Sequence, residues 1–358
     1  MTPVARPLTL GVLLALALAA CGPAAAPARP APAATSAPAA AGSASAPAAP
    51  SPPPLDTIKV AFAADAAIYA PYFIAMDKGY YAEEGLAIDM VKAGGGAATP
   101  ALISGDLQYS TSATSAVSAA IQGAPLKVIL TSADRVPYQM WSSTPEIHTL
   151  AELAGKTVGV QARGDTFEIA TRLLLHKHGL DPNGVVYTAI GTGNQRLVAM
   201  QTGSVAAMPL DTGIIVQLKA AGFPGNLLAD FEQEVRMPYQ GAATTDAELA
   251  QHRDRAKRFL RATLKGREYF KTYRDGTVDV LLKYNTVPRD ANEADYDDTL
   301  PTLTEDGTVP LDDARADALL RAQTNGIEQV PPAEQMYDFR LVREAYQELK
   351  ASGWQPAP

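Results

Sequence analysis

Three successive segments decide the fold class: IKVAF (58–62), APYFIAMDKG (70–79) and AIDMV (87–91). The first and third have the length and apolar content of short strands. The middle segment has Pro71 in its first turn and Gly79 just beyond its end, which predicts a helix over residues 71–78. Strands that alternate with helices pair in parallel, because the helix carries the chain back across the sheet. These residues therefore predict an α/β fold with a largely parallel sheet.

The same alternation continues toward the C-terminus. Further strands are expected at 107–110, 126–131, 157–160, 185–190, 205–208 and 227–229, with helices at 165–179, 194–202 and 211–222. Another helix is expected to have Thr99 as its N-cap and Pro100 at its first position. The remainder is mainly helical, with apolar stripes along 247–273 and 339–349 that we interpret as core. Two α/β units followed by helices predict a two-lobed molecule.

The N-terminus indicates export. Leu8–Ala20 is an uncharged apolar run, too short to cross a bilayer, and it ends at Cys21, the only cysteine in the chain. The segment resembles the lipobox of bacterial lipoproteins, so residues 1–21 are predicted to be a lipoprotein signal with Cys21 as the lipid attachment site. The alternative is an ordinary signal peptide with a chance cysteine. Residues 22–55 are almost wholly Ala, Pro and Ser, which predicts a disordered tether.

The composition argues against several function classes. The formal net charge is −8, and the absence of a basic cluster argues against nucleic acid as a partner. His176 and His178 lie two apart on a predicted helix and cannot share one metal ion. The segment GTGNQR (191–196) has two glycines of a dinucleotide-binding turn, but Arg196 occupies the third glycine position. We therefore expect no catalytic residue, no metal and no cofactor.

Six motifs occur in a characteristic order: APYFIAMDKGYYAEEGL (70–86), ALISGD (101–106), QGAPLKV (122–128), LAGKTVGV (153–160), RLVAMQTG (196–203) and YDFRLVREA (337–345). Together they resemble the NMT1/THI5-like solute-binding proteins, relatives of the sulfonate-, taurine-, nitrate- and pyrimidine-precursor-binding subunits. The resemblance implies a periplasmic-binding-protein fold with two α/β lobes joined by a hinge. Lobe 1 would comprise residues 56–135 plus 237–352, including the C-terminal helices, and lobe 2 residues 136–236. A monomer would bind a small molecule between the lobes and deliver it to an ABC permease with its ATPase.

Candidate ligand-binding residues follow from the rule that ligands bind beyond the carboxyl ends of parallel strands. Arg163 is either a charge partner for an anion or a solvated loop charge, and Asp211, like Asp165, either meets the ligand or simply caps a helix. Tyr138 and Trp141 either line the site near the hinge or pack beneath the crossing. The expected ligand-binding residues are Tyr69, Tyr72, Gly95, Ser112, Thr114, Arg163, Gly164, Thr166, Gln195 and Asp211.

The favoured function is an extracytoplasmic, membrane-anchored binding lipoprotein of an ABC importer. A ligand-sensing lipoprotein is an alternative, and an enzyme similar to the pyrimidine-precursor synthases on the same fold is a weaker one, because no reactive side chains correspond. Arg163 and the helix N-termini favour an organic anion such as a sulfonate or carboxylate. Tyr69 and Trp141 leave room for a pyrimidine-like ring.

Overall fold

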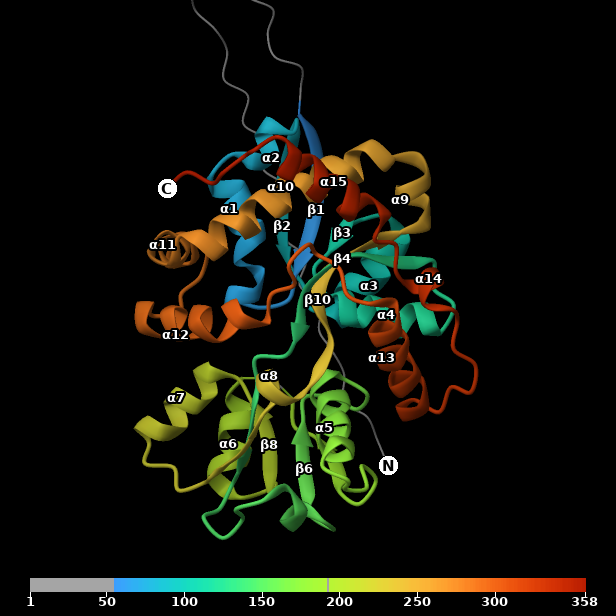
Figure 1. Ribbon diagram of the computed structural model, residues 1–358. Coiled ribbons are helices and arrows are strands. Elements are labelled where there is room, and N and C mark those ends of the chain that lie inside the picture. Colours follow the sequence, from blue (N-terminus) through green and yellow to red (C-terminus); the bar gives the residue numbers. More distant parts are fainter. Residues whose placement is uncertain (1–54, 192) are drawn as a thin grey trace, which may run out of the picture. The chain divides into compact units, whose positions relative to one another are not determined.

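The computed structural model describes residues 55–191 and 193–358, and the predicted signal, Cys21 and most of the tether lie outside these residues. The described chain forms two lobes, each built on its own five-stranded sheet (Figure 1). The sheet of the first lobe has the order β2 (Leu86–Lys92), β1 (Asp56–Phe62), β3 (Tyr109–Ser110), β10 (Arg236–Thr245), β4 (Leu126–Arg135). The sheet of the second lobe has the order β7 (Val186–Ala189), β6 (Thr157–Val160), β8 (Ala207–Leu210), β5 (Gln139–Ser142), β9 (Leu227–Asp230).

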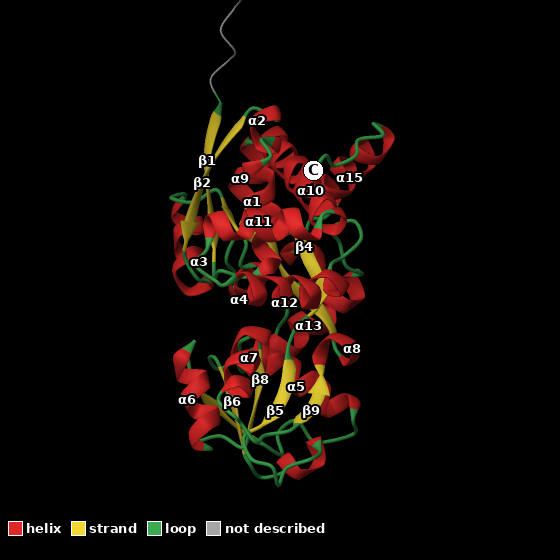
Figure 2. Ribbon diagram, turned by 90° about the vertical axis from the view of Figure 1, so that its left-hand side faces the viewer, coloured by secondary structure: helices red, strands yellow, loops and turns green. Residues whose placement is uncertain are grey.

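Helices pack on both sheets, as Figure 2 shows from the side. The first lobe contains η1 (Ala67–Tyr69), α1 (Ala70–Asp77), α2 (Tyr80–Glu83), α3 (Gly95–Ser104) and α4 (Ala113–Ile121). The second contains η2 (Leu150–Leu153), α5 (Thr166–Lys177), α6 (Asn194–Thr202), α7 (Thr212–Ala220) and α8 (Phe231–Glu234). The rest of the chain adds α9 (Asp246–Gln251), α10 (Arg253–Thr272), α11 (Arg274–Tyr284), α12 (Arg289–Thr299), η3 (Leu300–Thr302), α13 (Leu311–Thr324), α14 (Ala333–Met336) and α15 (Arg340–Ala351).

The chain passes between the lobes twice. It leaves β4 through residues 136–138 to enter β5, and it returns from β9 through α8 to β10. Near the crossing, β4 and β10 pair antiparallel, with Tyr239 opposite Ala133 and a register shift between Arg236 and Tyr239. Both sheets are consequently mixed, which corrects the expectation of a largely parallel sheet. The antiparallel strands β10 and β5 are those that the chain enters as it arrives from the other lobe, β5 through residues 136–138 and β10 through the four-residue helix α8.

The C-terminal helices complete the core of the first lobe. Helix α10 packs on α1 and α15, and its apolar stripe, including Phe259 and Phe270, is fully buried. The closest approach is at Gly266, where a Cβ atom would lie 2.0 Å from the carbonyl oxygen of Pro71. A glycine is required here because any side chain would push the two helices apart. The α1 motif thus depends on residues nearly two hundred positions away for its packing.

Two expected helix boundaries were wrong. Helix α3 begins at Gly95, before Thr99 and Pro100, because the Ala97 and Ala98 N–H groups already bond to the Gly94 carbonyl. The helix expected over 247–273 is two helices, α9 and α10, with the break at His252. Hydrophobic periodicity alone could locate neither the start of α3 nor the break at His252.

Candidate functional site

The lobes meet where the carboxyl ends of their strands face one another, and we call these facing surfaces the junction. On one side α7 of the second lobe packs on α12 of the first, and the Thr212 hydroxyl hydrogen-bonds the Asp298 carboxylate. On the other side α5 packs on α13. Gly164 lies against Asn325 so closely that a Cβ atom would be 2.7 Å from its side-chain oxygen. The residues that follow β8 and β6 therefore lie at the face between the two lobes.

Aromatic rings from the two crossings line the junction. Tyr138 follows β4, its ring stacks on Phe167 with 4.5 Å between centroids, and its hydroxyl lies 2.7 Å from the Tyr239 hydroxyl on β10. Burial raises the pKa of Tyr138 and of Tyr239, so both hydroxyls stay neutral at physiological pH. The crossing segments thus provide flat apolar surface together with uncharged hydrogen-bonding groups.

Carboxylates approach the junction from both lobes. Asp211 caps α7 through the Ile214 N–H and forms an ion pair with Arg196 at 2.6 Å. Asp295 on α12 accepts a 2.6 Å hydrogen bond from the Ala67 N–H, and burial raises its pKa to about 6. The charges of Asp211 and Asp298 raise the pKa of Asp295 further, while the Ala67 hydrogen bond opposes the shift. These contacts bring acidic groups that are distant in sequence into one site.

The residues expected in the β6–α5 loop lie together. Arg163 donates to the Tyr187 carbonyl oxygen at 3.1 Å and pairs with the buried Glu168 carboxylate, also at 3.1 Å. The same carboxylate accepts from the Gly164 N–H at 2.9 Å. Thr166 is the first residue of α5, which Asp165 caps by accepting from the Glu168 N–H. The Glu168 carboxylate also accepts from Arg172 at 2.8 Å, so Arg163 shares its partner with a second arginine of the second lobe.

The residues expected in the first lobe are more scattered. Gly95, Ser112 and Thr114 lie close together at the start of α3 and α4, where a Cβ on Gly95 would be 1.9 Å from the Ser115 hydroxyl. Tyr69 is buried at the end of η1. Tyr72 is also buried, and its ring stacks on Phe259 within the core of the first lobe. In the second lobe, Gln195 lines an open surface hollow with Asn194 and Val198, and Trp141 donates its indole N–H to the Gln139 side chain.

Several junction residues were missed because they lie in the C-terminal half, in which the sequence analysis proposed no ligand-binding residue. Asp295 and Asp298 are among them. On α13, Arg321 pairs with Asp317 at 2.7 Å, with each side chain only 2% exposed. Gln240 was also missed, and among the described residues it is the one non-glycine with positive φ, 50°. Such strain is typical of functional sites. The signal that could have found Arg321 is the i, i+4 spacing of Asp317 and Arg321 on a helix face whose other buried residues are alanines.

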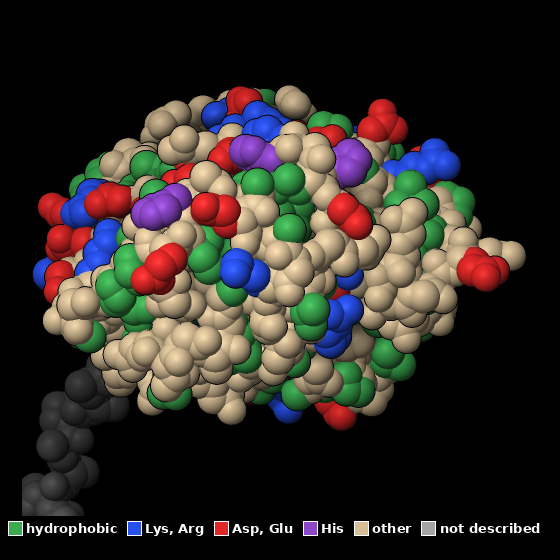
Figure 3. Space-filling view, turned by 90° about the horizontal axis from the view of Figure 1, so that it is seen from below, with side chains coloured by type: hydrophobic (Ala, Val, Ile, Leu, Met, Phe, Trp, Pro, Cys, Tyr) green, Lys and Arg blue, Asp and Glu red, His purple; other side chains and the backbone are tan. Residues whose placement is uncertain are grey.

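The described residues contain neither a cluster of metal-ligating side chains nor a helix long and apolar enough to cross a membrane. Figure 3 views the end of the second lobe from below, where acidic and basic side chains are interspersed. That face carries no large patch of one charge.

Comparisons with known proteins agree with this architecture. Residues 67–275 match the family described as NMT1/THI5 like. The chain is 30% identical over 297 residues to the riboflavin-binding protein RibY of Chloroflexus aurantiacus, covering 78% of each chain. The solved nitrate-binding protein NrtA of Synechocystis is 15% identical with a TM-score of 0.65, covering 83% of this chain and 90% of that one. The alkanesulfonate-binding protein SsuA of Xanthomonas axonopodis is 16% identical with a TM-score of 0.64, covering 80% of this chain and all of that one.

The two solved structures share the periplasmic-binding-protein fold with this protein: two mixed five-stranded sheets in separate lobes, with C-terminal helices. The family match spans more than half of the chain and includes the α1 motif and both crossings. The chain therefore belongs to the NMT1/THI5-like family of ABC solute-binding proteins.

Proposed function

We propose that this protein binds a neutral aromatic heterocycle of the flavin type between its lobes and delivers it to an ABC importer in the cell envelope. In this proposal residues 1–21 are a lipoprotein signal, Cys21 carries the lipid, and residues 22–55 tether the binding domain to the membrane. Residues 56–135 with 237–352 form one lobe and residues 136–236 the other. The solute is bound at the junction.

The charge balance of the junction is the observation that carries the choice of ligand class. Arg163, Arg196 and Arg321 each pair with a carboxylate of their own lobe. Asp295, in contrast, forms no ion pair within the described part of the chain. An anion about 5 Å from such a carboxylate would be repelled by about 3 kcal/mol at an effective dielectric constant of about 20. The junction therefore disfavours the sulfonates and carboxylates that the sequence favoured.

The same groups suit a flat neutral ring that carries N–H and O–H donors. The rings of Tyr138, Phe167 and Tyr239 are buried against one another at the crossings, and a flat ring bound beside them would extend this aromatic cluster. Carboxylates accept hydrogen bonds from hydroxyls and ring N–H groups. Micromolar affinity needs about 8 kcal/mol, which one ring contact plus several charge-assisted hydrogen bonds can supply. Riboflavin, with its flat ring and chain of hydroxyls, has this chemistry. The similarity to a riboflavin-binding protein supports the same class.

Fluorescence titration tests the proposal directly, because flavin emission is quenched when the ring stacks on aromatic side chains. We expect saturable quenching of riboflavin at low micromolar protein or below. Lumichrome, which keeps the ring and lacks the hydroxyl chain, should bind more weakly, and taurine and nitrate should not compete. Binding of taurine or nitrate together with no response to riboflavin would show that the ligand class is wrong.

A further inference from the structure

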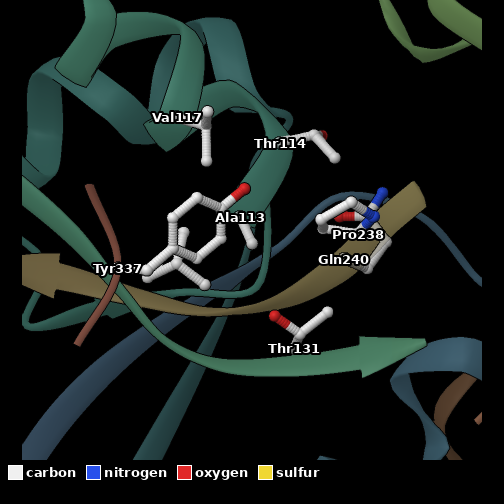
Figure 4. A pocket seen from close by; sticks show the side chains of 8 residues that line it. Ala113, Thr114, Val117, Thr131, Pro238, Gln240 and Tyr337 are labelled. Carbon is white, nitrogen blue, oxygen red and sulfur yellow. The ribbon is translucent and has the colours of Figure 1, made fainter. Parts of the chain in front are cut away.

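A small cavity lies inside the first lobe beside the start of α4. Residues of α4 line it together with β4, β10 and the segment before α15, and Figure 4 shows Tyr337 reaching in opposite Thr114, Thr131 and Gln240. Its volume of about 10 Å³ is close to the lower limit for one water molecule. The cavity can therefore hold a single oxygen-sized group.

Three polar atoms that line this cavity are buried without a hydrogen-bond partner in the described chain: the Tyr337 hydroxyl, the Thr131 hydroxyl and the side-chain oxygen Oε1 of Gln240. Tyr337 is 3% exposed and Thr131 is 1% exposed. Buried polar groups in proteins are almost always satisfied, and each exception needs a reason. Three exceptions around one cavity indicate that it binds something polar.

The chemistry of the lining selects the bound group. The two hydroxyls can donate to one carbonyl oxygen, and Oε1 of Gln240 can only accept, as from an adjacent N–H. No charged side chain lines the cavity, and an anionic group there would face the Gln240 oxygen. The complementary group is a neutral carbonyl with a neighbouring N–H, as in an amide or imide.

Gln240 connects the cavity to the junction. Gln240 is partly exposed and has the strained φ of 50°. Its side chain hydrogen-bonds the hydroxyl of the preceding residue, Tyr239. This bond lowers the pKa of Tyr239, although burial raises that pKa overall. Tyr239 in turn bonds Tyr138 across the crossing. A group held in the cavity therefore contacts the strand by which the chain returns from the second lobe.

We infer that this cavity is a subsite for the carbonyl oxygen at the amide or imide edge of the solute, with Tyr337 and Thr131 as donors to that oxygen and Gln240 as acceptor from the adjacent N–H. The inference rests on the proposed function, which places a neutral heterocycle at the junction. In riboflavin the only such edge is the imide of the pyrimidine part of the ring.

Single-hydroxyl variants of the full chain test the inference. Tyr337→Phe and Thr131→Val each remove one unpartnered hydroxyl and keep the shape, so the fold should be at least as stable as before. We expect each to weaken riboflavin and lumichrome binding by about five- to tenfold. Riboflavin methylated on the imide nitrogen should bind weakly to the unmodified protein and lose little more in Tyr337→Phe. The control is Tyr273→Phe, whose hydroxyl bonds the Pro356 carbonyl oxygen instead, and it should bind riboflavin normally.

The outcomes separate the subsite from the flavin proposal. Normal riboflavin binding by both hydroxyl variants would overturn the subsite and leave the flavin function standing. A variant that weakens riboflavin but not lumichrome would place the hydroxyl chain in the cavity, which also overturns the imide assignment. If riboflavin does not bind but uracil binds and depends on Tyr337, the subsite is supported and the flavin class is refuted. If neither binds, both are refuted.

Discussion

Replacing Asp295 with Asn removes a buried charge from the junction while keeping an oxygen that can accept from the Ala67 N–H. The pKa of Asp295 is raised from 3.8 to about 6, chiefly by burial. Because the carboxyl pKa is raised, the folded state favours the protonated form of Asp295. The stability that this protonation contributes is fully present below about pH 4 and is lost as the pH rises through 6. A rise in pKa from 3.8 to about 6 corresponds to about 3 kcal/mol.

Urea unfolding at pH 7 and pH 5 measures this contribution. We expect Asp295→Asn to stabilise the protein by up to about 3 kcal/mol at pH 7, because the unmodified protein there carries the ionised buried group. Between pH 7 and pH 5 the unmodified protein should gain about 1.3 kcal/mol from Asp295, and the variant should lack that gain. Asp297→Asn on the same helix is the control, since Asp297 pairs with Arg274, which lowers its pKa. Equal pH dependence in the Asp295 variant and the unmodified protein would refute the reasoning.

Four further predictions address the site, the hinge and export. Arg163→Ala should leave riboflavin affinity within about twofold, because the Arg163 side chain is 53% exposed and is already engaged with Glu168. A tenfold loss in the titration would restore the anion hypothesis. Gly241→Ala should lower the free energy of unfolding in urea by at least about 3 kcal/mol, because the φ of Gly241 is 147° and a Cβ would lie 1.9 Å from a carbonyl oxygen. The control Gly213→Ala should be neutral or stabilising. Thr212→Val removes the hydroxyl contact between the lobes and should weaken riboflavin binding about fivefold. Unchanged affinity would mean that this contact does not stabilise the arrangement of the lobes that binds riboflavin. Cys21→Ser should abolish labelling with a radioactive fatty acid, and persistent labelling would rule out Cys21 as the attachment site.

Local features were predicted well because their hydrogen bonds close within a few residues. Asp165 caps the helix that follows it, which is one of the two roles that the sequence left open for it. Helix α6 begins and ends as expected, at Asn194 and Thr202. The order of strand and helix patterns also predicted the two-lobed α/β fold. These features depend on backbone conformation and on nearby side chains, which the sequence specifies directly.

The role of Asp211 shows where this local information ends. The sequence left two roles open, helix capping and ligand contact, and the structure shows the cap together with an ion pair to Arg196. Arg196 had been considered only as an obstacle in a glycine-rich turn. It is buried instead, with its guanidinium 5.2 Å from the centre of the Phe167 ring. The sequence alone could not predict that Arg196 pairs with Asp211, because the contact depends on how α6 and α7 pack.

The sequence by itself determined the family, the alternation of strands and helices, and the candidate export signal, since each is written in short contiguous patterns. Only the tertiary structure decided the chemistry of the junction. It brought Asp295 to Ala67 and Tyr337 to Thr131 across more than two hundred residues, and it matched Arg163 with Glu168. The physical reason is that burial and neighbouring charges set the state of an ionisable group. Both are properties of the folded surroundings, to which distant parts of the chain contribute.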